Sequence, residues 1–273
     1  MSVKIHPQHW LAQAGRAVHR IVGEWWDLMH LGAGILVLAL SPSSYTPANR
    51  AILVRHMYVN TAPILLGFTV LCALASVVLT RIVVVTAHSY GLSQYALQLV
   101  IRVLVLELIP LSAALFVALR CTIPDGAELL TMYAKGLFGP STNGANYAMQ
   151  REVPPRVIAG LFAGTTLAAL SSVVAVVVAY LASYGFTVSG LANFTRLFGQ
   201  VFNPAVTLIF VLKILLFCLT VSLIPITSAL VGMRDSRVAR ASIVRTSSEM
   251  RGLVRMFTTL LLIEIASLVG NYY

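Results

Sequence analysis

Charged residues are scarce in this sequence. They make up 10% of the chain, only 9 residues are Asp or Glu, and 58% of the residues are hydrophobic. The mean hydropathy is +0.87, whereas a soluble domain carries roughly 25% charged residues. This composition excludes an ordinary soluble domain and predicts an integral membrane protein.

Other absences narrow the chemistry. The three cysteines, Cys72, Cys121 and Cys218, are scattered singly, which argues against a disulfide framework or a C-x-x-C metal site. No G-x-x-x-x-G-K-[ST] motif occurs, and no Gly is followed by Lys, so any ATP hydrolysis must come from another chain. No Ser/His/Asp arrangement or H-E-x-x-H motif supports catalysis.

The net positive charge and the N-terminal histidines do not indicate a nucleic-acid or metal site. The net charge of +10 is not accompanied by a basic stripe with interleaved aromatic residues, so no nucleic-acid partner is expected. His6, His9, His19 and His30 have no Cys or carboxylate at ligand spacing. No metal site is therefore predicted.

The apolar residues form long continuous runs. Runs of about 20 residues predict transmembrane helices rather than the alternating strands of a barrel. Only helices and closed barrels satisfy the backbone in lipid, so we predict an all-α bundle. Five spans are expected at about 59–83, 96–119, 155–181, 202–231 and 253–270.

The N-terminal segment has a different pattern. Residues 8–29 are amphipathic at helical spacing, which predicts a helix along the membrane surface with Trp25 and Trp26 at headgroup depth. Residues 31–40 are apolar but too short to span, and are expected to continue this element. A helix packed on a soluble partner is the alternative. We divide the chain into this interfacial segment (1–50) and a five-span domain (51–273).

Lys and Arg residues are distributed unevenly along the chain. They gather before the first span, between residues 120 and 156, and between the last two spans, whereas only Arg81 and Arg196 lie near the other side. The positive-inside rule then predicts a cytoplasmic N-terminus and an outward-facing C-terminus at Tyr273.

The segment 120–156 is expected to be a folded cytoplasmic loop. Thr122 resembles a helix cap with Asp125 three residues on, which predicts a short helix that Gly136 ends. Pro154 and Pro155 are well placed to open the third span.

Three charges are predicted near mid-membrane. Glu107 and Lys213 each lie about 16 Å along their helices at ~1.5 Å per residue, and Glu264 falls near the midplane from the other side. An unpaired charge there costs several kcal/mol. We therefore predict that Lys213 pairs with Glu107 or, failing that, with Glu264, because depth alone does not choose between the acids.

Arg81 and Arg102 lie towards the outer side, on the first and second spans. Either they bind a lipid phosphate in a cavity that opens outward, or they snorkel to the headgroups. Both interpretations stay open.

One set of residues recurs at the positions of a known family pattern: Glu107, Pro110, Ala113, Ala114, Leu115, Arg120, Ala127, Glu128, Met132, Pro155, Arg156, Ala159, Gly160, Lys213 and Glu264. In these residues the chain resembles the MlaE/YrbE-type permeases of MCE-associated ABC lipid transporters. It differs from that family at Leu106 and Ile109, where members usually have Arg and Gly. It also differs at 119–122, where Gly-Arg-Ala-Gly is usual, and at 133–136, where acidic residues are usual.

The resemblance implies a homodimer in the bacterial inner membrane, with phospholipid passing between the two permeases. It also implies ABC ATPase subunits that hold ATP and Mg, an MCE-domain protein on the periplasmic face, and a small STAS-like accessory subunit. This chain would be no enzyme and would bind no cofactor. The following residues would contact the ATPase: Arg120, Asp125, Glu128, Leu129, Leu130 and Tyr133.

A second hypothesis belongs to another class. Glu107, Lys213 and Glu264 could serve an ion-coupled secondary transporter or channel, although no inverted repeat with broken helices is evident. A membrane enzyme or scaffold is the third. Co-purification with a P-loop ATPase would favour the lipid-transporter permease.

Overall fold

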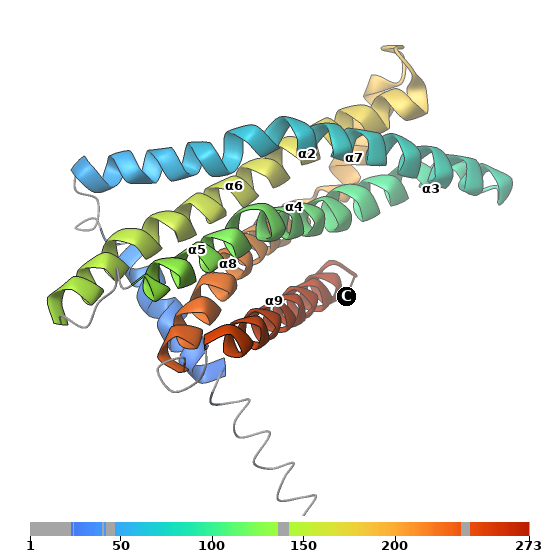
Figure 1. Cartoon of the computed structure of the whole chain (residues 1–273). Coiled ribbons are helices and arrows are strands. Elements are labelled where there is room, and N and C mark those ends of the chain that lie inside the picture. The colour runs from blue at the N-terminus through green and yellow to red at the C-terminus, as the bar shows by residue number, and fades with distance from the viewer. Residues whose placement is uncertain are drawn as a thin grey trace, which may run out of the picture.

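The computed structural model describes residues 23, 25–39, 41, 47–135, 142–235 and 241–272. Every regular element within these ranges is helical, and five helical stretches are long and apolar enough to cross a membrane (Figure 1). The prediction of an all-α integral membrane protein is confirmed. The spans are Arg50–Ser89, Tyr95–Met132, Arg151–Tyr184, Pro204–Val231 and Met250–Asn271.

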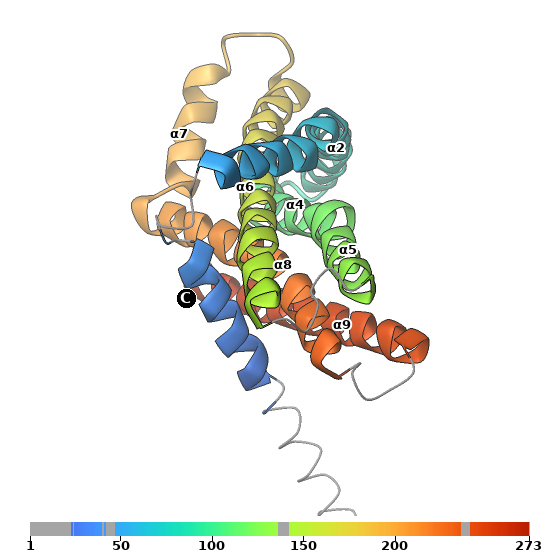
Figure 2. The ribbon, with the colours of Figure 1, turned by 60° about the vertical axis from the view of Figure 1, so that its left-hand side comes forward.

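The helices pack as two principal pairs. The elements are α2 (Pro47–Ser89), α3 (Ser93–Val100), η2 (Ile101–Leu108), α4 (Ile109–Val117), η3 (Ala118–Thr122), α5 (Ile123–Ala134), α6 (Thr142–Tyr184), α7 (Leu191–Val201), α8 (Pro204–Asp235) and α9 (Ala241–Tyr272). The most extensive contacts are those of α2 with α6 and of α8 with α9 (Figures 1 and 2). Because α6 also packs on α8, it joins the two pairs.

The second span is one continuous helical rod that contains two π-helical segments, η2 and η3. The residue that follows each segment donates five residues back, Ile109 to the Leu104 carbonyl and Ile123 to the Ala118 carbonyl. Each segment ends two residues before a proline, Pro110 or Pro124. A proline ring clashes with the carbonyl four residues earlier, and both of those carbonyls lie in the wider π turns. The π segments therefore let the helix continue past each proline.

The predicted bounds of the segment 120–156 are wrong, although a helix does lie within it as expected. The helical rod continues to Ala134, and α6 begins at Thr142 rather than at the proline pair. Thr122 is no helix cap, because it lies inside η3 and its hydroxyl donates to the Ala118 carbonyl at 3.4 Å. What was expected to be a separate short helix is thus the end of the second span.

A shorter apolar helix, Trp25–Ala39, precedes the first span. Its Ile35 is buried in one cluster with Leu223 and Ile226 of α8, whereas Trp26 and Met29 are exposed. The expected continuation of the N-terminal helix through residues 31–39 is confirmed. Residues 8–22 of the predicted amphipathic helix lie outside the described residues.

The helix α7 lies between the third and fourth spans and was not predicted. It runs beside the end of α6 (Figure 2), and Phe194 is buried against Tyr180 with ring centroids 5.2 Å apart. Phe198 stacks on Phe202 at 4.5 Å. The helical conformation is interrupted at Asn203. Its side-chain Oδ1 accepts the Val206 N–H at 2.8 Å and so caps α8.

The closest approach between α6 and α8 depends on two glycines, Gly160 and Gly164. A methyl group at residue 160 would lie 2.8 Å from Ser222 Oγ, and one at residue 164 would lie 2.6 Å from Cys218 Sγ. Small residues four apart are the usual means by which membrane helices come close together. Packing of α6 on α8 therefore excludes any larger side chain at these positions.

We expect Gly164→Ala to destabilise the protein by about 1–3 kcal/mol, because the added methyl overpacks a tight contact. Gly67→Ala is the matched control, since a methyl at that helical glycine meets nothing within 4 Å. The midpoint of thermal unfolding in detergent is the measurement. Equal midpoints for the two variants would contradict this account of the α6–α8 contact.

Candidate functional site

The ammonium group of Lys213 is the centre of a polar cluster in the apolar bundle. Its side chain is 1% exposed on α8. It donates a hydrogen bond to the Glu107 carboxylate of η2 and another, at 3.1 Å, to the Leu106 carbonyl. The Glu264 carboxylate of α9 lies 2.9 Å away. We call Glu107, Lys213 and Glu264 the charge cluster, and it ties three spans together.

The Leu106 carbonyl is available to Lys213 for a reason that lies in the sequence. In an α-helix this carbonyl would accept the N–H of residue 110, which here is a proline and has none. A buried carbonyl without a donor is costly. Lys213 supplies that donor from another helix, while its ammonium group also pairs with the two carboxylates.

The charge cluster extends the predicted pairing. Lys213 pairs with Glu107, as predicted, but Glu264 is a second partner rather than an alternative. The side chains of the two acids are 13% and 15% exposed, so all three charges are largely withdrawn from solvent. Breaking such a pair leaves a buried charge and costs about 3–5 kcal/mol.

A second polar cluster lies at the end of the bundle that holds α5. Arg156 of α6 is 1% exposed. Its Nη1 donates to the Asp125 carbonyl at 3.2 Å and to Glu128 Oε2 at 3.1 Å. Its Nη2 donates to Glu152 Oε2 at 3.4 Å and lies 3.9 Å from Met132 Sδ. We call this set of contacts the arginine clamp.

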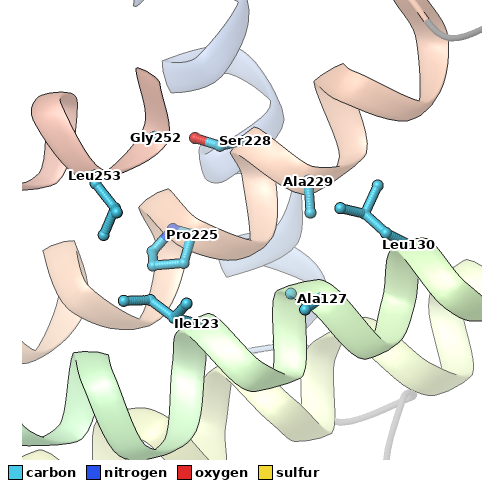
Figure 3. Close-up of a pocket in the computed structure, with 9 residues that line it drawn as sticks. Ile123, Ala127, Leu130, Pro225, Ser228, Ala229, Gly252 and Leu253 are labelled. Carbon is cyan, nitrogen blue, oxygen red and sulfur yellow. The ribbon is translucent and has the colours of Figure 1, made fainter. Parts of the chain in front are cut away.

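On the other side of α5 the packing leaves a small cavity. It has a volume of about 90 Å³ and lies between α5, α8 and α9. Figure 3 shows Ala127 and Leu130 of α5 facing Ala229 and Pro225 of α8 across this space. Gly252 of α9 also lines it. The two faces of α5 are therefore held differently, one by a buried cation and one by apolar packing on α8.

A wider open groove of about 700 Å³ runs along the first half of α8. Phe202, Leu208 and Leu212 line it, and nearly all of its lining is apolar. Such a groove suits a hydrocarbon chain better than a polar ligand.

None of the described residues forms a group of three or more His, Cys, Asp or Glu side chains that could hold a metal ion. The charge cluster fits this finding, since its two carboxylates already share the Lys213 ammonium. The arrangement is that of a structural clamp between helices.

The sequence profile of the family described as Permease MlaE matches residues 53–268. This range includes the larger part of each of the five spans. The chain belongs to the MlaE permease family. The search of curated proteins found no match. The permease is therefore a multi-pass membrane protein and the membrane subunit of an ABC-type transporter.

The structure corrects two of the residues predicted to contact an ATPase. Leu129 is fully buried, in one cluster with Val153 and Val157 of α6. Asp125 is buried and accepts a hydrogen bond from Asn60 Nδ2 of α2 at 3.2 Å. Both side chains face the permease interior, because the predicted surface helix is instead the packed end of a span.

The remaining predicted contact residues are accessible to different degrees. Arg120 is exposed, and the side chain of Glu128 is 51% exposed although it also binds Arg156. Leu130 is half-buried and lines the cavity. The side chain of Tyr133 lies outside the described part of the permease.

The two arginines predicted on the lipid path lie on different helices. Arg81 is exposed on α2, and Arg102 is half-buried on η2. Exposure on the bundle surface is compatible with both interpretations given above, phosphate binding and snorkelling.

Sequence reasoning gave Arg156 only as a position shared with the family. Its burial is the feature that was missed. A signal was present, because Arg156 directly follows two prolines and no other charged residue occurs until Arg196. An arginine at the head of so long an uncharged run must find partners nearby or stay at the surface.

We expect Lys213→Met to destabilise the permease by about 3–5 kcal/mol, because it leaves two buried carboxylates without their cation. Adding Glu107→Gln and Glu264→Gln should recover part of that loss, since the three charges act as one unit. Unfolding of the purified permease in detergent measures the effect. If the triple variant merely sums the three single losses, the charges are not coupled.

Proposed function

We propose that the permease is the membrane subunit of an ABC transporter that moves phospholipid between the bacterial inner membrane and an MCE-protein conduit. The observation that carries this proposal is the family match, which extends over all five spans. The sequence has no nucleotide-binding motif of the P-loop type, so ATP and Mg²⁺ belong to separate ATPase subunits.

The ATPase docks at the end of the bundle that holds α5. The basic residues that follow the positive-inside rule lie on this side of the spans, which makes it the cytoplasmic side. Arg120 and Glu128 are exposed there. The N-terminus is then cytoplasmic and the C-terminus periplasmic, where the MCE protein is bound. Two permeases form the dimer, with a small STAS-like accessory subunit beside each ATPase.

The lipid path uses the surface of the bundle rather than its core. The charge cluster lies in the core, where Lys213 already binds Glu107, Glu264 and the Leu106 carbonyl. The open apolar groove along α8 suits a hydrocarbon chain, and Arg81 of α2 is exposed for a lipid phosphate. Family membership favours this function over the ion-coupled alternative.

Reconstitution tests the proposal. The permease, purified with its co-eluting subunits, should transfer labelled phospholipid to the MCE protein only when ATP is supplied. Transfer that follows a proton or sodium gradient in the absence of ATP would support the ion-coupled hypothesis instead.

We expect Tyr133→Asp to release the ATPase while the permease stays in the membrane, because a charge at the end of α5 disfavours apolar docking. Leu130 is left unchanged, since it lines the cavity between α5, α8 and α9. Thr195→Asp, at an exposed position of α7 on the opposite side, is the control. Stoichiometry in a pull-down is the measurement. Full ATPase occupancy in Tyr133→Asp would mean that docking occurs elsewhere.

We expect a photocrosslinker at Val78, one turn from Arg81, to capture phospholipid more strongly than one at Val173. The two positions are 57% and 62% exposed, so a difference in labelling reports the arginine and not accessibility. Mass spectrometry of the labelled permease in native membranes is the measurement. Equal labelling would indicate that Arg81 only snorkels to the headgroups.

A further inference from the structure

We propose that Arg156 is the positioning residue that holds α5 in place for the ATPase, and that coupling of ATP hydrolysis to lipid movement depends on this side chain. The proposal rests on the function proposed above. It adds a route from the docking helix into the transmembrane bundle.

The guanidinium group contacts α5 over two helical turns. Its contacts are the carbonyl of Asp125, the carboxylate of Glu128 and the sulfur of Met132. These residues are spaced three and four apart, so they lie on one face of the helix. One side chain of α6 therefore fixes both the rotation and the height of α5.

The base of α5 is fastened to a third helix. Asn60 of α2 donates from its side chain to the Asp125 carboxylate. The backbone carbonyl of Asn60 accepts the Cys121 thiol at 3.3 Å. The backbone carbonyl of Asp125 also accepts a hydrogen bond from Arg156. Asp125 is therefore bound both by the arginine clamp and by α2.

The opposite face of α5 is held by apolar packing on α8. A methyl group at Gly126 would lie 3.3 Å from the Pro225 carbonyl, so the two helices are close at this point. Beside it a cavity remains, lined by Ala127, Ala229 and Gly252 (Figure 3). Apolar contacts are non-directional, whereas hydrogen bonds depend on angle. The hydrogen bonds from Arg156 thus add a directional constraint on α5 that packing on α8 does not supply.

The clamp needs arginine rather than another cation. Its acceptors lie in different directions, on two helices, and the planar fork of five N–H groups reaches them together. A lysine ammonium at the same place would meet one or two of them. The charge alone is therefore insufficient.

Arg156 also connects α5 to the rest of the bundle. It lies one helical turn before Gly160, where α6 is in close contact with Ser222 of α8. The same helix α8 carries Lys213 and the charge cluster. A displacement of α5 that Arg156 passes to α6 thus arrives at α8 within one turn.

The test compares Arg156→Met and Arg156→Lys with Leu129→Ala. Leu129 lies on α5, the helix that Arg156 holds, and it is buried against α6. Its truncation therefore loosens the packing of α5 without removing the arginine clamp. Each variant is purified with its ATPase, and the lipid transferred per ATP hydrolysed is measured in proteoliposomes. Thermal midpoints are recorded for all three.

We expect Arg156→Met to lower the lipid transferred per ATP at least tenfold and Arg156→Lys to recover only part of it. Leu129→Ala should stay within twofold of the wild type despite a lower midpoint. If Leu129→Ala lowers the lipid transferred per ATP as much as Arg156→Met does, and the two variants have the same thermal midpoint, the loss reflects general stability. The proposal would then be wrong.

A distance measurement gives a second readout. Spin labels at Lys135→Cys, the residue that follows α5, and at Ala169→Cys of α6 occupy exposed positions, and the three native cysteines are buried. We expect the distance distribution to broaden in Arg156→Met and to stay narrow in Leu129→Ala. An unchanged distribution in Arg156→Met would overturn the positioning role.

The two proposals fail in different ways. A wild-type permease that binds no ATPase and transfers no lipid would refute the proposed function. If the wild type is active and Arg156→Met keeps the same lipid transfer per ATP, the function stands and only the role of Arg156 is refuted.

Discussion

A single buried ammonium group determines how three of the five spans meet. Lys213 is the only charged residue of α8 before Arg234, and a lone cation within a span costs several kcal/mol. Its partners are two carboxylates and a backbone carbonyl, and they come from two other helices. The positions of η2 and α9 relative to α8 follow from this requirement. Apolar packing alone would not select one arrangement, because lipid tails are as apolar as the helices themselves.

The two polar clusters and the glycine contacts each fix a different part of the helix arrangement. Gly160 and Gly164 set the separation of α6 and α8, since no larger side chain fits there. The charge cluster sets the depth of α8 against its neighbours, and the arginine clamp sets α5 against α6. Between these points the helices bury small and aliphatic residues that carry little directional information. A few polar side chains therefore specify the fold of a largely apolar chain.

The sequence was sufficient to predict those features that a single energetic contribution determines. Apolar run length predicts the five spans, and the cost of an unpaired charge predicts the Lys213–Glu107 pair. It was insufficient where tertiary context decides. Pro124 ends an ordinary helix, but the π turn of η3 carries the chain past it, and local propensity does not reveal such a turn. Leu129 was assigned to the surface because its helix was expected to stand alone, whereas α6 buries it.

The length of α6 has a mechanical consequence. This helix has 43 residues, and at ~1.5 Å per residue it is about 65 Å long, roughly twice the hydrocarbon thickness of a bilayer. If it pivots near the midplane, a tilt of about 10° moves each end by roughly 5 Å, given that helix length. α6 is then a lever arm whose fulcrum is the glycine contact with α8. Small rotations inside the membrane would then become displacements of several ångströms at both ends of α6.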